Sequence, residues 1–262
     1  MSDERAPSKG SPQPMPDDLW ADLRRLTVAR IGLKRAGASL ATSPLLDFQL
    51  AHARARDAVH APFDEARLIA DIGTLGGPVL AVASAADDRQ RYLMRPDLGR
   101  RLAAGAEATL APHAGRYDVV FVVSDGLSAR AVETHARPVL AGVLPALRAE
   151  AWLIAPLVVV RHGRVAIGDV IAAVLGADCV AVLIGERPGL TAPDSMGAYL
   201  TWQPRADTTD AKRNCISNIR PEGIGYADAA FKLAHMLRAM RSRRVSGVAL
   251  KDDSDRRLIE RR

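Results

Sequence analysis

The strongest constraint on the fold lies at residues 157–184, where two apolar runs flank a segment with helical periodicity. The runs read LVVV and CVAVLI, and both are rich in β-branched residues, which is typical of strands buried on both faces. The segment between them, residues 167–176, carries Ile171, Val174 and Leu175 on one helical face. A strand, a helix and a strand of these lengths predict a βαβ unit with a right-handed crossover.

The loop after the second run is the first candidate for a binding site. In open parallel sheets, ligands bind beyond the carboxyl ends of the strands. Residues 185–189 (GERPG) occupy this position, in a loop that is charged and conformationally constrained. Another buried run, DVVFVV at 118–123, precedes residues 124–128 (SDGLS), which open a helix. These five residues fit two interpretations, a helix N-cap with a tight turn or a second loop lining the same crevice.

Further segments alternate between strand-like and helical patterns. Strands are expected at 79–83, 199–202 and 245–250, and helices at 20–28, 43–59 and 226–241. A helix also begins at Ala129, where Pro138 and Pro145 are expected to kink or split it. Strands that alternate with helices predict an α/β fold: a Rossmann-like, open, largely parallel sheet flanked by helices, with an N-terminal helical segment.

Composition divides the chain into four regions. Residues 1–16 contain four prolines and few apolar side chains, so we expect a disordered tail. Residues 17–65 form the N-terminal helical segment, and residues 66–250 form the Rossmann-like domain. Residues 251–262 form a charged C-terminal tail.

Charge and hydropathy argue against two classes of partner. No run approaches the roughly 18 apolar residues of a membrane span, and the N-terminus lacks the apolar core of a secretory signal. We therefore expect a cytoplasmic protein with no membrane partner. Residues 238–262 contain nine basic and four acidic residues, which accounts for most of the net charge of +6. Because no aromatic residues are interleaved there for stacking on bases, we expect no nucleic-acid partner.

The residues show no self-sufficient active site. Residues 32–39 resemble the phosphate-binding pattern G-x-x-x-x-G-K-[ST], but Ala38 replaces the lysine that would contact the phosphates, which favours a structural turn. His52 and His60 have no second histidine four residues on, so helix-surface or interface positions are favoured over a metal site. G-x-S-x-G and G-x-G-x-x-G are absent. We expect neither catalytic residues nor a metal site.

The two cysteines predict no disulfide framework. Cys179 lies inside an apolar run and is interpreted as a small core residue. Cys215 lies beside the polar residues Asn214 and Ser217, and composition alone favours a loop thiol of no consequence.

Several strings along the chain resemble a single family. The strings most similar to the small (light) subunit of ethanolamine ammonia-lyase are GRVAIGD at 163–169, LIGERPGL at 183–190 and RNCISNIRPEG at 213–223. Further matching strings follow in sequence order at 29–60, 92–102 and 118–132. Together they extend the resemblance over most of residues 20–250.

The resemblance implies a two-subunit ammonia-lyase that converts ethanolamine into acetaldehyde and ammonia with adenosylcobalamin. In this family a large (heavy) barrel subunit holds the substrate and the catalytic groups, and the cofactor lies between it and the small, Rossmann-like subunit. Residues 66–250 are then the cobalamin-binding domain. Members of the family often reside in a bacterial microcompartment, although nothing in these residues shows whether this chain does.

The resemblance also implies three cofactor-binding residues, Val165, Glu186 and Cys215. Val165 is apolar and suits contact with a corrin or base face, although composition alone favours a core position. Glu186 suits an acceptor for corrin amides or ribose hydroxyls, and the alternative is a surface charge paired with Arg187. Cys215 suits packing of its sulfur against the cofactor.

The sequence also bears on the lower ligand of the cobalt ion. The string D-x-H-x-x-G, by which some cobalamin proteins supply a histidine to cobalt, is absent, so the base of the cofactor is expected to remain the lower ligand. The competing hypothesis is a non-catalytic, Rossmann-like module that binds a nucleotide and regulates a partner. It explains the missing catalytic groups equally well.

Overall fold

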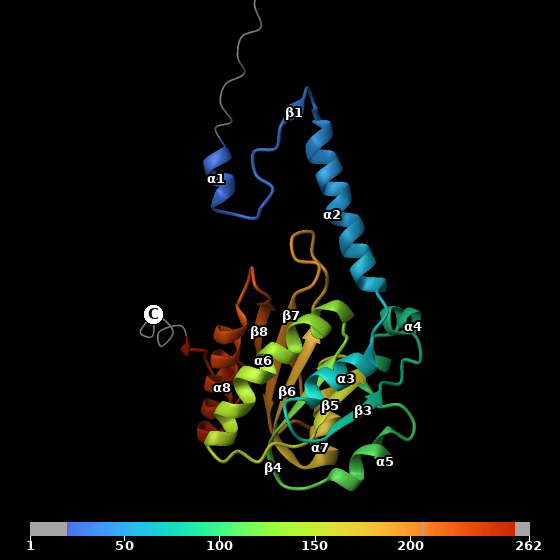
Figure 1. Ribbon diagram of the computed structural model, residues 1–262, viewed down its shortest axis with the longest axis vertical. Helices are drawn as coiled ribbons and strands as arrows, with labels where there is room; N and C mark the ends of the chain where they lie inside the picture. The colour runs from blue at the N-terminus through green and yellow to red at the C-terminus, as the bar shows by residue number, and fades with distance from the viewer. Residues whose placement is uncertain (1–19, 206, 255–262) are drawn as a thin grey trace, which may run out of the picture. The chain divides into compact units, whose positions relative to one another are not determined.

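The computed structural model describes residues 20–205 and 207–254 of the chain (Figure 1). The contacts within the chain divide it into two compact units, residues 1–50 and 51–262. The tail expected at residues 1–16 lies outside the described residues, as does the charged C-terminal tail beyond Ser254.

The described part of the first unit, residues 20–50, contains only small elements and no buried side chain. Its elements are α1 (Ala21–Arg25), the strands β1 (Arg35–Ala36) and β2 (Ser39–Leu40), and the start of α2 (Thr42–His60). The two strands form an antiparallel hairpin around Gly37, where φ is +62°. This geometry confirms the structural-turn interpretation of the glycine-rich stretch. The helix predicted at 20–28 is shorter than expected, and α2 begins one residue before the predicted N-cap.

The second unit is built on a six-stranded sheet. Its strands are β3 (Val79–Ala83), β4 (Tyr117–Ser124), β5 (Leu157–Arg161), β6 (Ala177–Gly185), β7 (Met196–Trp202) and β8 (Arg213–Ile219). Their order across the sheet is β3-β5-β4-β6-β7-β8. The first four pair in parallel, and β7 and β8 extend the sheet antiparallel. The predicted α/β class with a largely parallel sheet is confirmed.

Helices cover both faces of this sheet. The helices of the second unit are α3 (Glu65–Gly73), α4 (Arg89–Met94), α5 (Ala106–Leu110), α6 (Ala129–Ala149), α7 (Ile167–Leu175) and α8 (Tyr226–Arg243). Four short 3₁₀ turns accompany them, η1 (Leu98–Arg100), η2 (Ala111–His113), η3 (Asp210–Lys212) and η4 (Gly247–Ala249).

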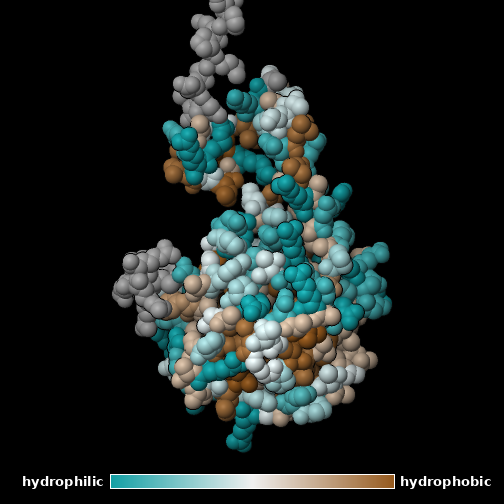
Figure 2. Space-filling view, viewed as in Figure 1, coloured by the Kyte–Doolittle hydropathy of each residue, from teal (hydrophilic) through white to brown (hydrophobic). Residues whose placement is uncertain are grey.

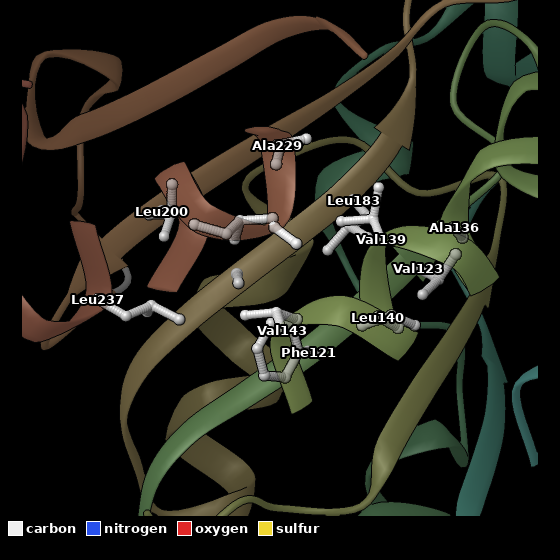
Figure 3. Close-up of a cluster of buried hydrophobic side chains, with 14 of the residues drawn as sticks. Phe121, Val123, Ala136, Val139, Leu140, Val143, Leu183, Leu200, Ala229 and Leu237 are labelled. Atoms are coloured by element: carbon white, nitrogen blue, oxygen red, sulfur yellow. The ribbon is translucent and has the colours of Figure 1, made fainter. Parts of the chain in front are cut away.

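Alternate side chains of β4 enter two separate cores. Phe121 and Val123 pack with α3, α6 and α8, and Figure 3 shows Phe121 close to Val143 of α6. Val120 and Val122 point to the other face, where they pack with α5 and α7. Because successive side chains of a strand point to opposite faces, one continuous apolar run serves both cores. The helix between the two central strands, predicted from its spacing, is α7, and Gly176 ends it in a left-handed conformation.

Two predicted elements need correction. The predicted split of the helix from Ala129 is wrong, because α6 continues through Pro138 and Pro145. Its apolar face is buried along its whole length against the sheet, and this packing outweighs the cost of roughly 3 kcal/mol for each interior proline. The strand predicted at 245–250 is also wrong. Gly247 there has φ +71°, which interrupts an extended chain, and the segment forms η4.

Candidate functional site

The sheet topology creates a crevice between the ends of β4 and β5. These strands are neighbours, but β4 leads into α6 on one face of the sheet and β5 leads into α7 on the other. Where successive connections diverge in this way, the loops at the carboxyl ends of the strands separate and leave room for a ligand. The end of β6 lies directly beside the end of β4, with Ile184 opposite Ser124. Three loops therefore meet at this edge.

A pocket of about 460 Å³ lies at this edge of the sheet. Its lining residues come from the loops after β4, β5 and β6, from α4 and from β7 and β8: Tyr92, Leu127, Arg164, Val165, Ile184, Gly185, Glu186, Arg187, Tyr199 and Ser217. Two of the three predicted site residues, Val165 and Glu186, thus face one pocket from different strand ends. Cys215 is not part of the lining, although its neighbour across the strand pair, Tyr199, is.

Glu186 is held in place by β8. Its Oε1 accepts a hydrogen bond from the Ser217 hydroxyl, and its Oε2 accepts one of 3.1 Å from the backbone N–H of Asn218. The carboxylate thus crosses from the end of β6 to β8, over Gly197 on the strand between them, where a Cβ would lie 3.0 Å from Oε1. Among the described residues no ion pair joins Glu186 to Arg187, so the simple surface-pair interpretation is not supported.

Cys215 lies on β8 directly opposite Tyr199, so its assignment to a loop is wrong. The residue is exposed as a whole, yet partial burial of its thiol raises the pKa of that group. The Tyr199 hydroxyl, on the residue opposite, partly offsets this effect on the Cys215 pKa. Burial also raises the pKa of Tyr199 above its ordinary value. Both groups are therefore neutral near pH 7, and they form a polar pair of low reactivity at the edge of the pocket.

Val165 follows Arg164 in the loop after β5, and both residues line the pocket. The guanidinium carbon of Arg164 lies 4.2 Å from the centroid of the Tyr92 ring, and its Nη2 donates a 3.2 Å hydrogen bond to the Tyr92 carbonyl. Its Nε is buried and has no hydrogen-bond partner. An unpaired buried N–H is costly, so the Arg164 side chain retains unused donor capacity at the pocket.

A buried carboxylate supports these loops from behind. Asp125 accepts a hydrogen bond of 2.7 Å from the backbone N–H of His162 and one of 3.2 Å from Nη1 of Arg89. The same Arg89 nitrogen donates to the Gly126 carbonyl at 2.6 Å. Burial raises the pKa of Asp125, and the positive charge of Arg89 and the nearby His162 only partly offset it. Asp125 thus joins α4 to the loops after β4 and β5.

The loops after β4 and β6 are in direct contact. The N–H of Leu127 donates to the Gly185 carbonyl at 2.9 Å, and a Cβ on Gly126 would lie 2.4 Å from that oxygen. Residues 124–128 therefore both turn into α6 and line the crevice. Ser128 occupies the N-cap position, but its hydroxyl donates to the Pro193 carbonyl instead of capping the helix. The loop therefore fits both interpretations, a tight turn into a helix and a wall of the crevice, but the Ser128 side chain does not cap the helix.

Sequence reasoning missed Tyr92 and Arg164 as pocket residues, and Arg89 as the partner of Asp125 behind the pocket. Tyr92 is fully buried and anchors the pocket floor, where its hydroxyl donates to the Gly163 carbonyl at 3.1 Å. Arg164 directly precedes Val165 in the string GRVAIGD, so the family resemblance already included this residue. Arg89 gave no local signal, because its partner Asp125 is distant in the sequence.

Two kinds of feature are absent from the described ranges. No helix between Trp20 and Ser254, Ala206 aside, combines the length and apolar character needed to cross a membrane. In the same ranges, no cluster of three or more His, Cys, Asp or Glu side chains is placed to hold a metal ion.

The fold and the pocket define an α/β protein with a candidate ligand site, which combines apolar contacts with one carboxylate, two guanidinium groups and hydroxyl groups. The family model described as "Ethanolamine ammonia-lyase light chain (EutC)" matches residues 17–251. The chain belongs to the ethanolamine ammonia-lyase light chain family.

Curated relatives match this chain over nearly its whole length. The chain is similar to the ethanolamine ammonia-lyase small subunit of Ralstonia nicotianae, with 52% identity over 99% of this chain and 97% of the relative. It is 53% identical to the small subunit of Xanthomonas campestris pv. campestris strain B100, over 95% of this chain and 93% of the relative. The small subunit of Azotobacter vinelandii is also 53% identical, over 92% of this chain and 91% of that protein.

Proposed function

We propose that this chain is the small subunit of an adenosylcobalamin-dependent ethanolamine ammonia-lyase, which converts ethanolamine into acetaldehyde and ammonia. It binds the cofactor through the pocket at the ends of β4, β5 and β6, at the interface with the large subunit. The observation that carries this proposal is that Val165 and Glu186, both implied by the family resemblance, line one pocket. Cys215 lies one strand-pair position away, against Tyr199.

The residues present fit a corrinoid. A corrin ring offers broad apolar faces, and Val165, Leu127 and Ile184 give the pocket apolar walls. The ring also carries amide side chains and a phosphate, which need acceptors and donors. Glu186 supplies acceptor oxygens, and the unpaired Nε of Arg164 marks unused donor capacity.

Each residue then has a binding role. Val165 contacts an apolar face of the cofactor, and Glu186, oriented by Ser217 and Asn218, accepts hydrogen bonds from its amides or ribose hydroxyls. Cys215 packs its sulfur at the pocket edge. When bound, adenosylcobalamin supplies the radical chemistry, while the proteins orient and shield it. We assign no residue of this chain to proton transfer with the substrate.

The size of the pocket supports an interface site. Pockets that enclose a drug-sized ligand measure roughly 300–1,000 Å³. At about 460 Å³, this pocket is at the lower end of that range, and a corrinoid is much larger than a drug-sized ligand. The chain therefore covers one part of the cofactor, and the large barrel subunit covers the rest and supplies the catalytic groups.

Variants of the proposed contacts test this function in the reconstituted two-subunit enzyme. Glu186→Gln removes a charge-assisted acceptor, and such hydrogen bonds contribute roughly 1.5–3 kcal/mol, so cobalamin affinity should fall about 10- to 100-fold. Cys215→Ala removes only packing and a weak donor, so its loss should be smaller. Glu107→Gln, an exposed residue of α5, is the control and should leave affinity unchanged. Affinity is measured by the change in cobalamin absorbance on binding.

Turnover against cofactor concentration separates binding from chemistry. At saturating adenosylcobalamin both variants should recover most of the wild-type turnover, because neither residue takes part in the reaction. A loss of maximal rate that excess cofactor does not restore contradicts the binding role. Absence of cobalamin binding by the complex, with binding of a nucleotide to the chain alone, would favour the regulatory-module hypothesis instead.

A further inference from the structure

The N-terminal unit exposes most of the large apolar side chains at the surface of the described chain. Thirteen large hydrophobic residues are exposed there, and nine of them lie between Trp20 and Leu50. They are Trp20, Leu23, Leu26, Val28, Leu40, Leu45, Leu46, Phe48 and Leu50. Figure 2 shows hydrophobic residues at the surface of α1 and along the first turns of α2. Such concentration on a short segment is typical of an interaction surface.

The described residues of this unit do not bury these side chains. None of its described side chains is buried, and neither apolar core of the described chain includes a residue of this unit. A segment of about 30 residues is too small to form a hydrophobic core alone. Its internal contacts are local, such as the cation–π contact of Arg30 with Phe48 at 5.8 Å. The family match begins at residue 17, so this segment belongs to the part shared with the family.

The net charge of residues 20–50 indicates which kind of protein surface can cover them. Residues 20–50 contain five basic residues (Arg24, Arg25, Arg30, Lys34 and Arg35) and two acidic ones, a net charge of +3. The whole chain has a net charge of +6, so a second copy carries charge of the same sign, as does the rest of this chain. Repulsion between like charges disfavours both a second copy and the rest of this chain as the surface that covers the segment. A different protein with an apolar groove and an acidic rim is the complementary occupant.

We infer that residues 20–50 are a docking segment, which inserts its apolar side chains into an acidic-rimmed groove of the large subunit. This inference rests on the proposed two-subunit function but uses none of the pocket residues. The segment adds an attachment point separate from the cofactor pocket, so removing its apolar groups weakens subunit association without changing the pocket itself.

A matched pair of triple variants of the full chain tests the inference. The test variant is Leu26→Ser, Val28→Ser and Leu46→Ser, whose residues are 84%, 73% and 57% exposed. The control is Val248→Ser, Met94→Ser and Leu153→Ser in the other unit, which are 84%, 71% and 60% exposed. Affinity for the purified large subunit is measured by surface plasmon resonance without cofactor. We expect a loss of about 100-fold or more for the test variant and less than about threefold for the control.

Charge reversal gives an independent readout. Lys34→Glu with Arg35→Glu should weaken association and reduce its dependence on salt, because opposite charges attract less at high ionic strength. Arg243→Glu with Arg244→Glu, exposed at the end of α8, should preserve the wild-type salt dependence. Equal effects of the two reversals, or of the two triple variants, overturn the inference.

Two measurements on the isolated chain test whether a second copy, or the chain itself, covers the segment instead. Concentration-dependent dimerisation of the wild type that the test triple variant abolishes means that a second copy covers the segment. A large loss of thermal stability in that variant without the large subunit means that the segment packs on its own chain. Either result overturns the inference. Wild-type subunit affinity in the Glu186→Gln variant, with reduced cobalamin binding, keeps this test separate from that of the proposed function.

Discussion

Asp125, at the end of β4, accepts a 2.7 Å hydrogen bond from the backbone N–H of His162, at the end of β5. The bond spans the crevice behind the pocket and joins the two loops that diverge to opposite faces of the sheet. His162 has φ +57°, a left-handed conformation that is uncommon for a residue with a side chain. The carboxylate of Asp125 therefore helps to hold the β5 loop in the conformation that presents Arg164 and Val165.

Replacing Asp125 should destabilise the fold. Asp125→Ala leaves the guanidinium of Arg89, which is mostly buried, without its carboxylate, and leaves the His162 N–H unpaired. Breaking a buried pair on one side costs about 3–5 kcal/mol, and we expect about 2–4 kcal/mol here because Arg89 retains some solvent contact. Urea unfolding measures the change. Asp87→Ala, which breaks an exposed pair with Arg91, should cost less than about 1 kcal/mol. Equal losses in the two variants contradict the role of Asp125.

Gly126→Ala should be more disruptive than an alanine substitution at a left-handed glycine that has open space beside it. Gly126 has φ +53°, and an added Cβ would lie 2.4 Å from the Gly185 carbonyl. Gly105, with φ +83°, has nothing within 4 Å of the same position. Gly105→Ala should therefore cost only the backbone strain of about 1–2 kcal/mol, while Gly126→Ala should cost about 2 kcal/mol more. The two free energies of unfolding are compared in urea. A smaller loss at Gly126 than at Gly105 contradicts the contact between the loops.

His135 should make stability dependent on pH. It lies on α6, with Nδ1 2.9 Å from the Tyr226 hydroxyl and Nε2 2.9 Å from the Asp194 carbonyl. Burial lowers the pKa of His135 below that of an unfolded histidine, about 6.5. As pH falls below about 6.5, the unfolded chain binds the proton first, so the contribution of His135 to stability is lost.

The test compares unfolding free energies at pH 7.5 and 5. His135→Gln should reduce the decline in stability between these values, although it should also lower stability at pH 7.5. His60→Gln, at the exposed end of α2, should leave the decline unchanged. A decline of wild-type size in His135→Gln rejects the assignment.

The two thiols should react at different rates. Cys215 is exposed on β8, while Cys179 is buried in the core of the sheet. Iodoacetamide should label one thiol in the native chain and the second only after unfolding. Labelling should accelerate as pH rises, because burial raises the pKa of the Cys215 thiol and its thiolate is the nucleophile. Mass spectrometry identifies the site, and native labelling of the Cys215→Ala variant would contradict this assignment.

Local patterns predicted the centre of the fold well. The apolar runs before and after α7, and Gly176 at its end, placed β5, α7 and β6 because these signals depend only on neighbouring residues. The segment 245–250 was misassigned because its conformation depends on a distant residue. Asn214 accepts a hydrogen bond from the Gly247 N–H and donates to the carbonyls of Gly247 and Leu250, which favours a turn over a strand.

The site was only partly predictable for the same reason. Val165, Glu186 and Cys215 came from the family resemblance, and spacing alone does not single them out. The salt bridge between Arg89 and Asp125 and the stacking of Arg164 on Tyr92 join residues that are far apart in sequence. Such pairs form only when the order of strands in the sheet is set, and that order follows from the packing of the whole domain.

A pocket that covers only part of its ligand has a thermodynamic consequence. Under the proposed function, the cofactor contacts both subunits, so its binding and their association share one free-energy cycle. Whatever factor the large subunit adds to cobalamin affinity, bound cobalamin must add to the affinity between subunits. Loss of cofactor would then loosen the enzyme, and dilution of the subunits would release the cofactor.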